Sequence, residues 1–159
     1  MEKNNKDDMS TSYTREIIVS TIPKEIFKAL TTGFNKWWTT GCNFVSKSGD
    51  KITFKFGTSY WVMLAINLIP EKLVELECIE AHHVHDGLPS SILNEWKGSK
   101  LIWNIHRQDD KTKIVFTHKG LVPSLECYDI CKQGWDYFFI NSLQQYLNTG
   151  VGSPFVNKS

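Results

Sequence analysis

Short stretches in which apolar and polar residues alternate, separated by turn-forming residues, occupy most of this chain. Alternation with a period of two is typical of strands that bury one face. It predicts strands over 13–20, 42–47, 51–57, 60–69, 72–81, 100–108 and 111–120. Asp109–Asp110 is the expected turn between the last two, and short connections of this kind favour antiparallel hairpins.

Helical periodicity appears in three places. A helix is predicted over 21–32, with Pro23 near its first position, and a second short helix over 34–38. From 124 to 148 there is no proline, and large side chains recur on one helical face. They are Tyr128, Cys131, Trp135, Phe138, Phe139, Ser142, Leu143 and Tyr146. Such a helix buries that face against a sheet, so we predict the order strand, two helices, six strands, long helix.

The stretch 81–95 interrupts the strands with glycine, proline and two serines. A connection of this length without a function is uncommon, so we expect it to be mobile and to gate a cavity. Residues 1–12 are polar and mixed in charge, which predicts a disordered tail. We expect a single domain over 13–155 and a short second tail over 156–159.

Composition narrows the possible functions. The 159 residues carry a formal net charge of +1, so no global field recruits nucleic acid. The apolar run 60–66 is too short to span a bilayer, and no membrane insertion is predicted. Because the first residues show no apolar leader, we expect a cytoplasmic protein with four free thiols. Aromatic residues reach 13%, and so many rings fill a core, line a cavity or face a partner.

Several segments carry a resemblance to a known superfamily. They are IPKEIFKALT at 22–31, IPEKLVEL at 69–76, EWKGSKLIWNI at 95–105, IVFTHKGL at 114–121 and GWDYFFINSLQQYLNTGVGSPF at 134–155. Through them the chain resembles the SRPBCC superfamily, the START-like and birch-pollen-allergen-like domains. Within it the chain is similar to the branch named after the activator of the heat-shock-protein-90 ATPase.

The resemblance implies an α+β helix-grip fold. In this fold a curved antiparallel sheet of six to seven strands wraps around the long C-terminal helix and leaves an elongated cavity between them. Relatives bind lipids, sterols, hormones or polyketides in that cavity. The resemblance therefore implies that a small apolar molecule is the partner of this chain.

The helix face and the neighbouring strands supply the candidate binding residues. Cys131 and Ser142 lie near the centre of a face otherwise made of rings, where small side chains leave room and offer a hydrogen bond. The alternative is that Ser142 bonds its own helix carbonyl and Cys131 only packs. With the resemblance, this reasoning selects as ligand-binding residues Trp61, Trp103, Ile105, Phe116, His118, Cys131, Trp135, Phe138 and Ser142.

Two orientations stay open. Along 100–108 either Trp103 and Ile105 or Asn104 and its alternating neighbours face inward, and we favour Trp103 and Ile105. His118 could anchor a polar ligand head or act as a general base. The alternative is a histidine that locks the turn between strand and helix.

No metal site, cofactor or catalytic residue is predicted. His82, His83 and His85 form a cluster in a loop with no distant third ligand evident. Cys127 and Cys131 lie one helical turn apart and supply only half of a tetrahedral zinc site. Free, buried thiols are the simpler interpretation.

Trp37 and Trp38 are adjacent in the predicted short helix. Adjacent helical residues point in different directions, so at least one of the two is expected to face outward, at a pocket mouth or an interaction surface. The alternative is that one of them plugs the helix into the sheet.

These observations support three hypotheses. The first is non-enzymatic binding of a small lipid-like or aromatic molecule between the sheet and the C-terminal helix. The second is a protein-interaction module related to the chaperone activator, with a chaperone or a second copy of the chain as partner. The third is a cavity enzyme of the aromatase, cyclase or hydrolase type with His118 as base, although we consider the protein more compatible with a non-enzymatic role.

Overall fold

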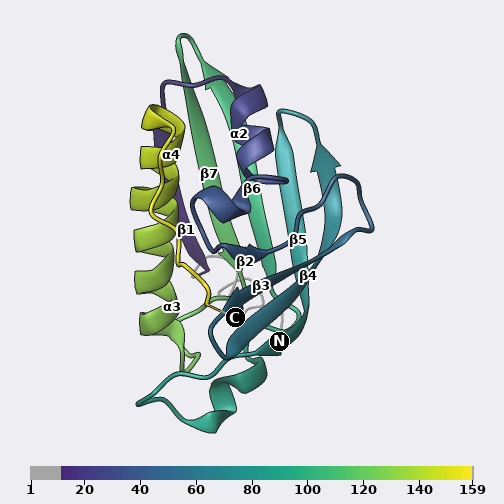
Figure 1. Cartoon of the computed structure of the whole chain (residues 1–159), viewed down its shortest axis with the longest axis vertical. Coiled ribbons are helices and arrows are strands. Elements are labelled where there is room, and N and C mark those ends of the chain that lie inside the picture. The colour runs from purple at the N-terminus through teal and green to yellow at the C-terminus, as the bar shows by residue number, and fades with distance from the viewer. Residues whose placement is uncertain (1–11, 159) are drawn as a thin grey trace, which may run out of the picture.

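A single curled antiparallel sheet forms the body of the computed structural model, which describes residues 12–158 (Figure 1). Its strand order is β1-β7-β6-β5-β4-β3-β2. The strands are β1 (Tyr13–Val19), β2 (Gly41–Cys42), β3 (Lys51–Phe56), β4 (Ser59–Ile69), β5 (Leu73–His82), β6 (Lys100–Gln108) and β7 (Lys111–Lys119). The helices are α2 (Pro23–Ala29), η1 (Phe34–Lys36), η2 (Ser90–Asn94), α3 (Tyr128–Trp135), η3 (Asp136–Leu143) and α4 (Gln144–Thr149). The predicted α+β helix-grip architecture is confirmed.

The strand over 42–47 is predicted too long, because only Gly41–Cys42 pair with β3. Side chains replace the ladder beyond that point. Asn43 donates to the Lys51 carbonyl at 3.1 Å and accepts the Thr53 N–H at 2.8 Å. Asparagine competes with regular strand hydrogen bonding in this way, so the strand ends early.

Irregularities in β4 accompany the curl of the sheet. The pairing of β4 with β5 shifts register between Val62 and Met63 and again between Ala65 and Asn67. Extra residues of this kind bend a strand and increase its twist. The bends let the end of β4 that carries Trp61 and the end of β5 curve toward the C-terminal helix (Figure 1).

The predicted helix over 124–148 is present, although it begins at Tyr128 and continues to Thr149. Its central segment, η3, is π-helical, and Gly150 ends it with a φ of 89°, a left-handed conformation that suits glycine. The helix runs along one side of the sheet (Figure 1). Its most buried side chains are Cys131, Trp135, Phe139, Ser142 and Leu143, all on the predicted face.

The prediction that Trp103 and Ile105 face inward is confirmed. Trp103 and Ile105 on β6 are buried, whereas Asn104 is only partly covered and His106 is exposed. The strand β7 alternates in the same way and buries His118 among its inward residues. The hairpin between them turns at Asp109, whose φ of 55° an aspartate tolerates better than most residues.

The expectation that Trp37 or Trp38 faces outward is wrong, because both side chains are buried. The short helix ends at Lys36, so the two residues do not occupy successive positions of a regular helix. Their rings stack 6.1 Å apart, and the Trp37 indole donates to the Ala29 carbonyl at 2.9 Å. All six tryptophans of the chain are buried.

The chain returns to the start of the fold after α4. Phe155 exchanges backbone hydrogen bonds with Trp38 and Thr40 at 2.8 and 2.9 Å. Gly152 permits the close approach, because a Cβ there would collide with the Lys36 carbonyl oxygen. Asn157 follows and accepts the Gly57 N–H at 2.8 Å, so the described part of the expected second tail contacts the domain.

The expected N-terminal tail lies outside the described residues except for Ser12. That residue is buried, and its hydroxyl accepts the Gly120 N–H at 3.1 Å. Within residues 12–158, no helix combines the length and the apolar character needed to cross a membrane.

Candidate ligand-binding pocket

A pocket of about 320 Å³ lies between the first half of the C-terminal helix, the Trp61 end of β4 and the segment that follows β5. Aromatic rings form most of its wall. The lining residues are Trp38, Phe56, Ser59, Trp61, His83, Val84, His85, Trp96, Ile130, Cys131, Gly134, Trp135 and Phe138. The volume is at the small end of the range for ligand pockets, and a predominantly apolar lining with few polar groups is typical of them.

Four tryptophans from four segments form the continuous part of the wall. The Trp61 ring on β4 lies 4.8 Å from Trp96, which follows η2. Trp96 stacks at 6.0 Å on Trp135 of α3, and Trp135 lies 4.7 Å from Trp38. Large rings that pack on one another leave irregular space at their edges, and the pocket occupies this space.

A chain of hydrogen bonds fixes the Trp135 ring and the backbone of Trp96. Trp135 donates its indole N–H to Nδ1 of His118 at 3.0 Å, so the imidazole proton resides on Nε2. Nε2 then donates to the Ser99 hydroxyl at 2.9 Å, and Ser99 donates to the Trp96 carbonyl at 2.6 Å. Burial lowers the pKa of His118 to about 3, so the ring stays neutral at ordinary pH.

The structure brings four of the nine sequence-predicted site residues to the pocket. Trp61, Cys131, Trp135 and Phe138 are in its wall. The other five are buried in the core of the fold and are not among the lining residues: Trp103, Ile105, Phe116, His118 and Ser142. The Trp103 and Phe116 rings stack on each other at 4.8 Å, and both contact the Trp135 ring edge to face.

Ser142 has a structural hydrogen-bonding role. Its hydroxyl donates to the Trp37 carbonyl at 2.7 Å and accepts the Ser153 N–H at 2.8 Å. The side chain is fully buried. It therefore ties the C-terminal helix to the segment after η1 and to the returning chain, rather than to its own helix carbonyl.

Sequence reasoning missed several wall residues. Trp96 belongs to the quoted motif over 95–105, yet nothing in its local pattern indicates that it lines a cavity, and Trp38 and Phe56 belong to segments far from the helix in sequence. His83 and His85 come from the 81–95 stretch, so part of this stretch borders the pocket, while its mobility and its role as a gate stay predictions. A tryptophan within an otherwise polar loop is the one signal that could have indicated Trp96.

Two pocket residues carry buried polar atoms without a hydrogen-bond partner among the described residues. They are Nε1 of Trp61 and Nδ1 of His83, and the third such side-chain atom is Nε1 of Trp103 in the core. An unsatisfied buried donor or acceptor costs about 1–3 kcal/mol. A bound water, ion or ligand is one way in which the set of partners of such an atom is completed.

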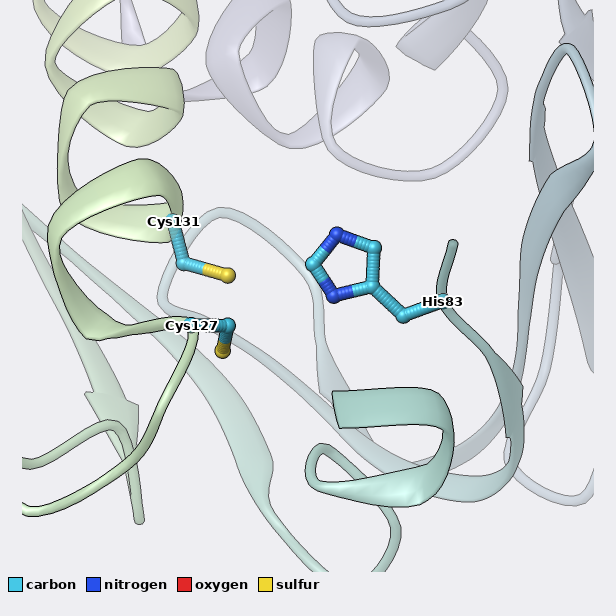
Figure 2. Close-up of side chains that lie close together, drawn as sticks. All are labelled: His83, Cys127 and Cys131. Carbon is cyan, nitrogen blue, oxygen red and sulfur yellow. The ribbon is translucent and has the colours of Figure 1, made fainter. Parts of the chain in front are cut away.

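Two cysteines from the start of α3 lie beside one of these atoms. The sulfurs of Cys127 and Cys131 and a ring nitrogen of His83 all lie within 4.8 Å of one another, and the three residues are buried (Figure 2). A hydrogen bond with Cys131, together with burial, raises the pKa of the Cys127 thiol, and the His83 ring acts in the opposite direction. The histidine and cysteine clusters, which the sequence presents separately, are therefore adjacent in space.

Glu95 joins the segment after β5 to the helix. Its two carboxylate oxygens accept the N–H groups of Glu126 and Cys127 at 2.9 and 3.0 Å. Free N–H groups at a helix start need such partners. The pocket wall that carries Trp96 is held to α3 by this contact.

A curled antiparallel sheet that holds a long C-terminal helix over an aromatic pocket defines the helix-grip class of proteins. The chain belongs to the family described as Activator of Hsp90 ATPase homolog 1-like protein, whose model matches residues 20–148. No curated protein matches the chain.

Solved structures share the fold. The Aha1 dimer from Colwellia psychrerythraea is 26% identical, with a TM-score of 0.72, and the match covers 89% of this chain and 98% of that one. DynU16, from the dynemicin biosynthetic locus, is 15% identical with a TM-score of 0.70, over 93% of this chain and 51% of its own. A protein from Mesorhizobium loti is 16% identical with a TM-score of 0.62, over 80% and 92%. The family and the fold support one of two roles for this chain, a ligand-binding module or a module similar to cofactors of the Hsp90 chaperone.

Proposed function

We propose that this protein binds a small apolar molecule, aromatic or lipid-like, in the pocket between the C-terminal helix and the segment after β5. The observation that carries the proposal is the aromatic wall, in which Trp61, Trp96 and Trp135 surround a space of about 320 Å³. An apolar guest removes this surface and its own from water. Burying roughly 300 Å² of guest surface contributes about 7 kcal/mol before the costs of association are subtracted.

The unpartnered polar atoms of the pocket favour a guest that carries a polar group. Within residues 12–158 the buried indole N–H of Trp61 has no hydrogen-bond partner, and neither does the buried Nδ1 of His83. A guest with a single oxygen or nitrogen at one end would meet these groups, whereas a pure hydrocarbon would leave them unsatisfied. The proposed guest is therefore apolar along most of its length with one polar end.

Gly134 provides a direct test. It lines the pocket, and a Cβ at this position would meet open space. Gly134→Leu is expected to fill part of the pocket without disturbing the helix, since leucine is a better helix former than glycine. Gln133→Leu is the matched control, because the same side chain is added at an exposed neighbouring position.

The measurement is the titration of metal-free protein with an apolar dye of the anilinonaphthalene sulfonate type, followed by fluorescence. The parent and Gln133→Leu should show saturable, one-site, micromolar binding, and Gly134→Leu should lose it. Equal binding by all three proteins would place the dye elsewhere and contradict the proposal.

A chaperone-cofactor-like interaction is the second candidate function, supported by the family and by 26% identity to the Aha1 dimer. An exposed tryptophan surface would have favoured this hypothesis further, but all six tryptophans are buried. A purified chaperone of the Hsp90 type, titrated with labelled protein, tests it directly. Saturable binding that survives Gly134→Leu would favour this candidate over the pocket.

The enzyme hypothesis has no support in this geometry. It gave His118 the role of base, but both ring nitrogens already have hydrogen-bond partners and the pKa of about 3 makes the ring a weak base. His118 also lies outside the pocket wall.

A further inference from the structure

Three metal-binding side chains converge at one edge of the pocket. His83 follows β5, and Cys127 and Cys131 stand at the start of α3, some forty residues further along the chain. One ligand atom from each lies within 4.8 Å of the other two, and all three residues are buried. Imidazole nitrogen and cysteine sulfur are the ligands that zinc and other soft metal ions prefer.

The histidine supplies an independent indication of a missing partner. Its side chain is 7% exposed, and Nδ1 is buried without any hydrogen bond to the described residues. In Figure 2 this nitrogen, next to the carbon that carries the Cβ, lies on the side of the ring that faces the two thiols. Its backbone is fixed, since the His83 N–H donates to the Leu93 carbonyl at 2.9 Å. The ring is thus held in place with a nitrogen available for a metal ion.

Both thiols are positioned as well. The Cys131 N–H donates to the Cys127 carbonyl at 2.8 Å in the first turn of the helix, which sets the spacing of the pair. Glu95 accepts the Cys127 N–H at 3.0 Å. The Trp96 indole donates to the Cys131 sulfur at 3.2 Å, which is a usual outer-shell contact of a coordinating thiolate.

Geometry and charge select the metal. At zinc–sulfur bonds of about 2.3 Å and tetrahedral angles, ligand atoms lie about 3.8 Å apart, so separations within 4.8 Å close by small side-chain rotations. Two thiolates and Zn²⁺ are together neutral, whereas two thiolates and Cu⁺ leave a net negative charge. A buried aromatic pocket disfavours an unpaired charge, which favours zinc.

We propose that His83, Cys127 and Cys131 form a three-ligand zinc site whose fourth position opens into the aromatic pocket. His83 and Cys131 belong to the pocket wall, so this position faces the space that a guest would occupy. Three protein ligands and an open position are typical of zinc sites that hold water or a bound molecule, in contrast to closed structural sites. The polar end of a guest would reach the metal there.

The test uses the reduced, metal-free full chain titrated with Co²⁺, whose thiolate complexes absorb in the near ultraviolet, and then with Zn²⁺ as the competitor. The parent should bind one Co²⁺ per chain with thiolate charge-transfer absorption, and one equivalent of Zn²⁺ should displace it. Cys127→Ser and Cys131→Ser should lose the absorption. His83→Gln should weaken binding more than about tenfold, since even outer-shell losses typically cost about 10–100-fold.

Cys78→Ser and His106→Gln are the controls, a buried cysteine outside the cluster and an exposed histidine on β6. Both should bind like the parent, and circular dichroism of every variant confirms folding. No stoichiometric metal in the parent, binding that survives both cysteine changes, or binding of Cu⁺ without Zn²⁺ would overturn the proposal. Because the dye titration uses metal-free protein, failure of the zinc site leaves the pocket proposal intact, and the reverse also holds.

Discussion

Trp135 donates its indole N–H to Nδ1 of His118 at 3.0 Å, and this bond joins the wall of the pocket to the core of the sheet. Nε2 of the imidazole donates to the Ser99 hydroxyl, and this hydroxyl donates to the Trp96 carbonyl. Trp96 and Trp135 are stacked neighbours in the pocket wall. A neutral histidine thus orients one wall ring and anchors the backbone of the other.

The neutral state of His118 predicts a dependence of stability on pH. Its pKa falls from 6.5 in the unfolded chain to about 3 in the fold. The unfolded state therefore binds an extra proton below pH 6.5, so the contribution is complete above that pH and is lost as the pH falls toward 3. Between pH 7 and pH 5 the free energy of unfolding should decrease by about 2 kcal/mol from this group.

Chemical denaturation at both pH values measures this decrease. His118→Gln removes the titrating group, so its stability should be lower at pH 7 but should change less between pH 7 and pH 5. The exposed His106→Gln is the control and should keep the parent slope. A parent slope that persists in His118→Gln would show that other groups cause the dependence.

Two glycines should respond in opposite ways to alanine. A Cβ at Gly134 meets open space within a helix, so Gly134→Ala should stabilise the protein by about 0.5–1 kcal/mol. A Cβ at Gly152 would collide with the Lys36 carbonyl oxygen, so Gly152→Ala should cost about 1–3 kcal/mol. Melting temperatures of the two variants compare them directly. Changes of the same sign would contradict this part of the structure.

Ser142 should matter for stability and not for ligand binding. Ser142→Ala removes two buried hydrogen bonds, to Trp37 and from Ser153, and should lower the free energy of unfolding by about 1–3 kcal/mol. The exposed Ser124→Ala should change it by less than about 0.5 kcal/mol. Dye affinity of folded Ser142→Ala should match the parent. A selective loss of affinity with unchanged stability would return Ser142 to the binding site.

The contact of Glu95 with the start of α3 should restrain the motion of residues 83–89. Glu95→Ala leaves the N–H groups of Glu126 and Cys127 without their partner, which should cost about 1–2 kcal/mol, similar to the loss of a helix cap. Amide hydrogen exchange should then accelerate in 83–89 and at the start of α3. Glu126→Ala, an exposed neighbour, is the control. Unchanged exchange in 83–89 would show that the contact does not restrain this segment.

The architecture could be predicted from the sequence because it depends on local periodicity. Trp135, Phe139 and Leu143 share one face of a single helix, so helical periodicity alone predicts that they are buried together. The inward-facing residues of β6 follow from the alternation of apolar and polar residues along the strand. The pocket could not be predicted in the same way. Its wall depends on how far the sheet curls, which is set by the shifts of register in β4, and on rings such as Trp96 that come from irregular segments.

Ser142 shows why a helix face alone does not locate a cavity. A small side chain among rings can leave space, or it can allow another segment to approach. Here the approaching segments are the Trp37 carbonyl and the chain near Ser153, which arrive from opposite ends of the sequence. The open space lies instead beside Gly134, two turns earlier on the same helix.

The indole N–H resonances in a two-dimensional NMR spectrum of the protein test the central claim most directly. All six tryptophans are buried, but Trp38, Trp61, Trp96 and Trp135 line the pocket, whereas Trp37 and Trp103 do not. Addition of the apolar dye to metal-free protein should shift the four pocket signals with one common affinity and leave the other two near their original positions. Large shifts of Trp37 and Trp103 with unmoved pocket signals, or no shifts at saturating dye, would contradict the account.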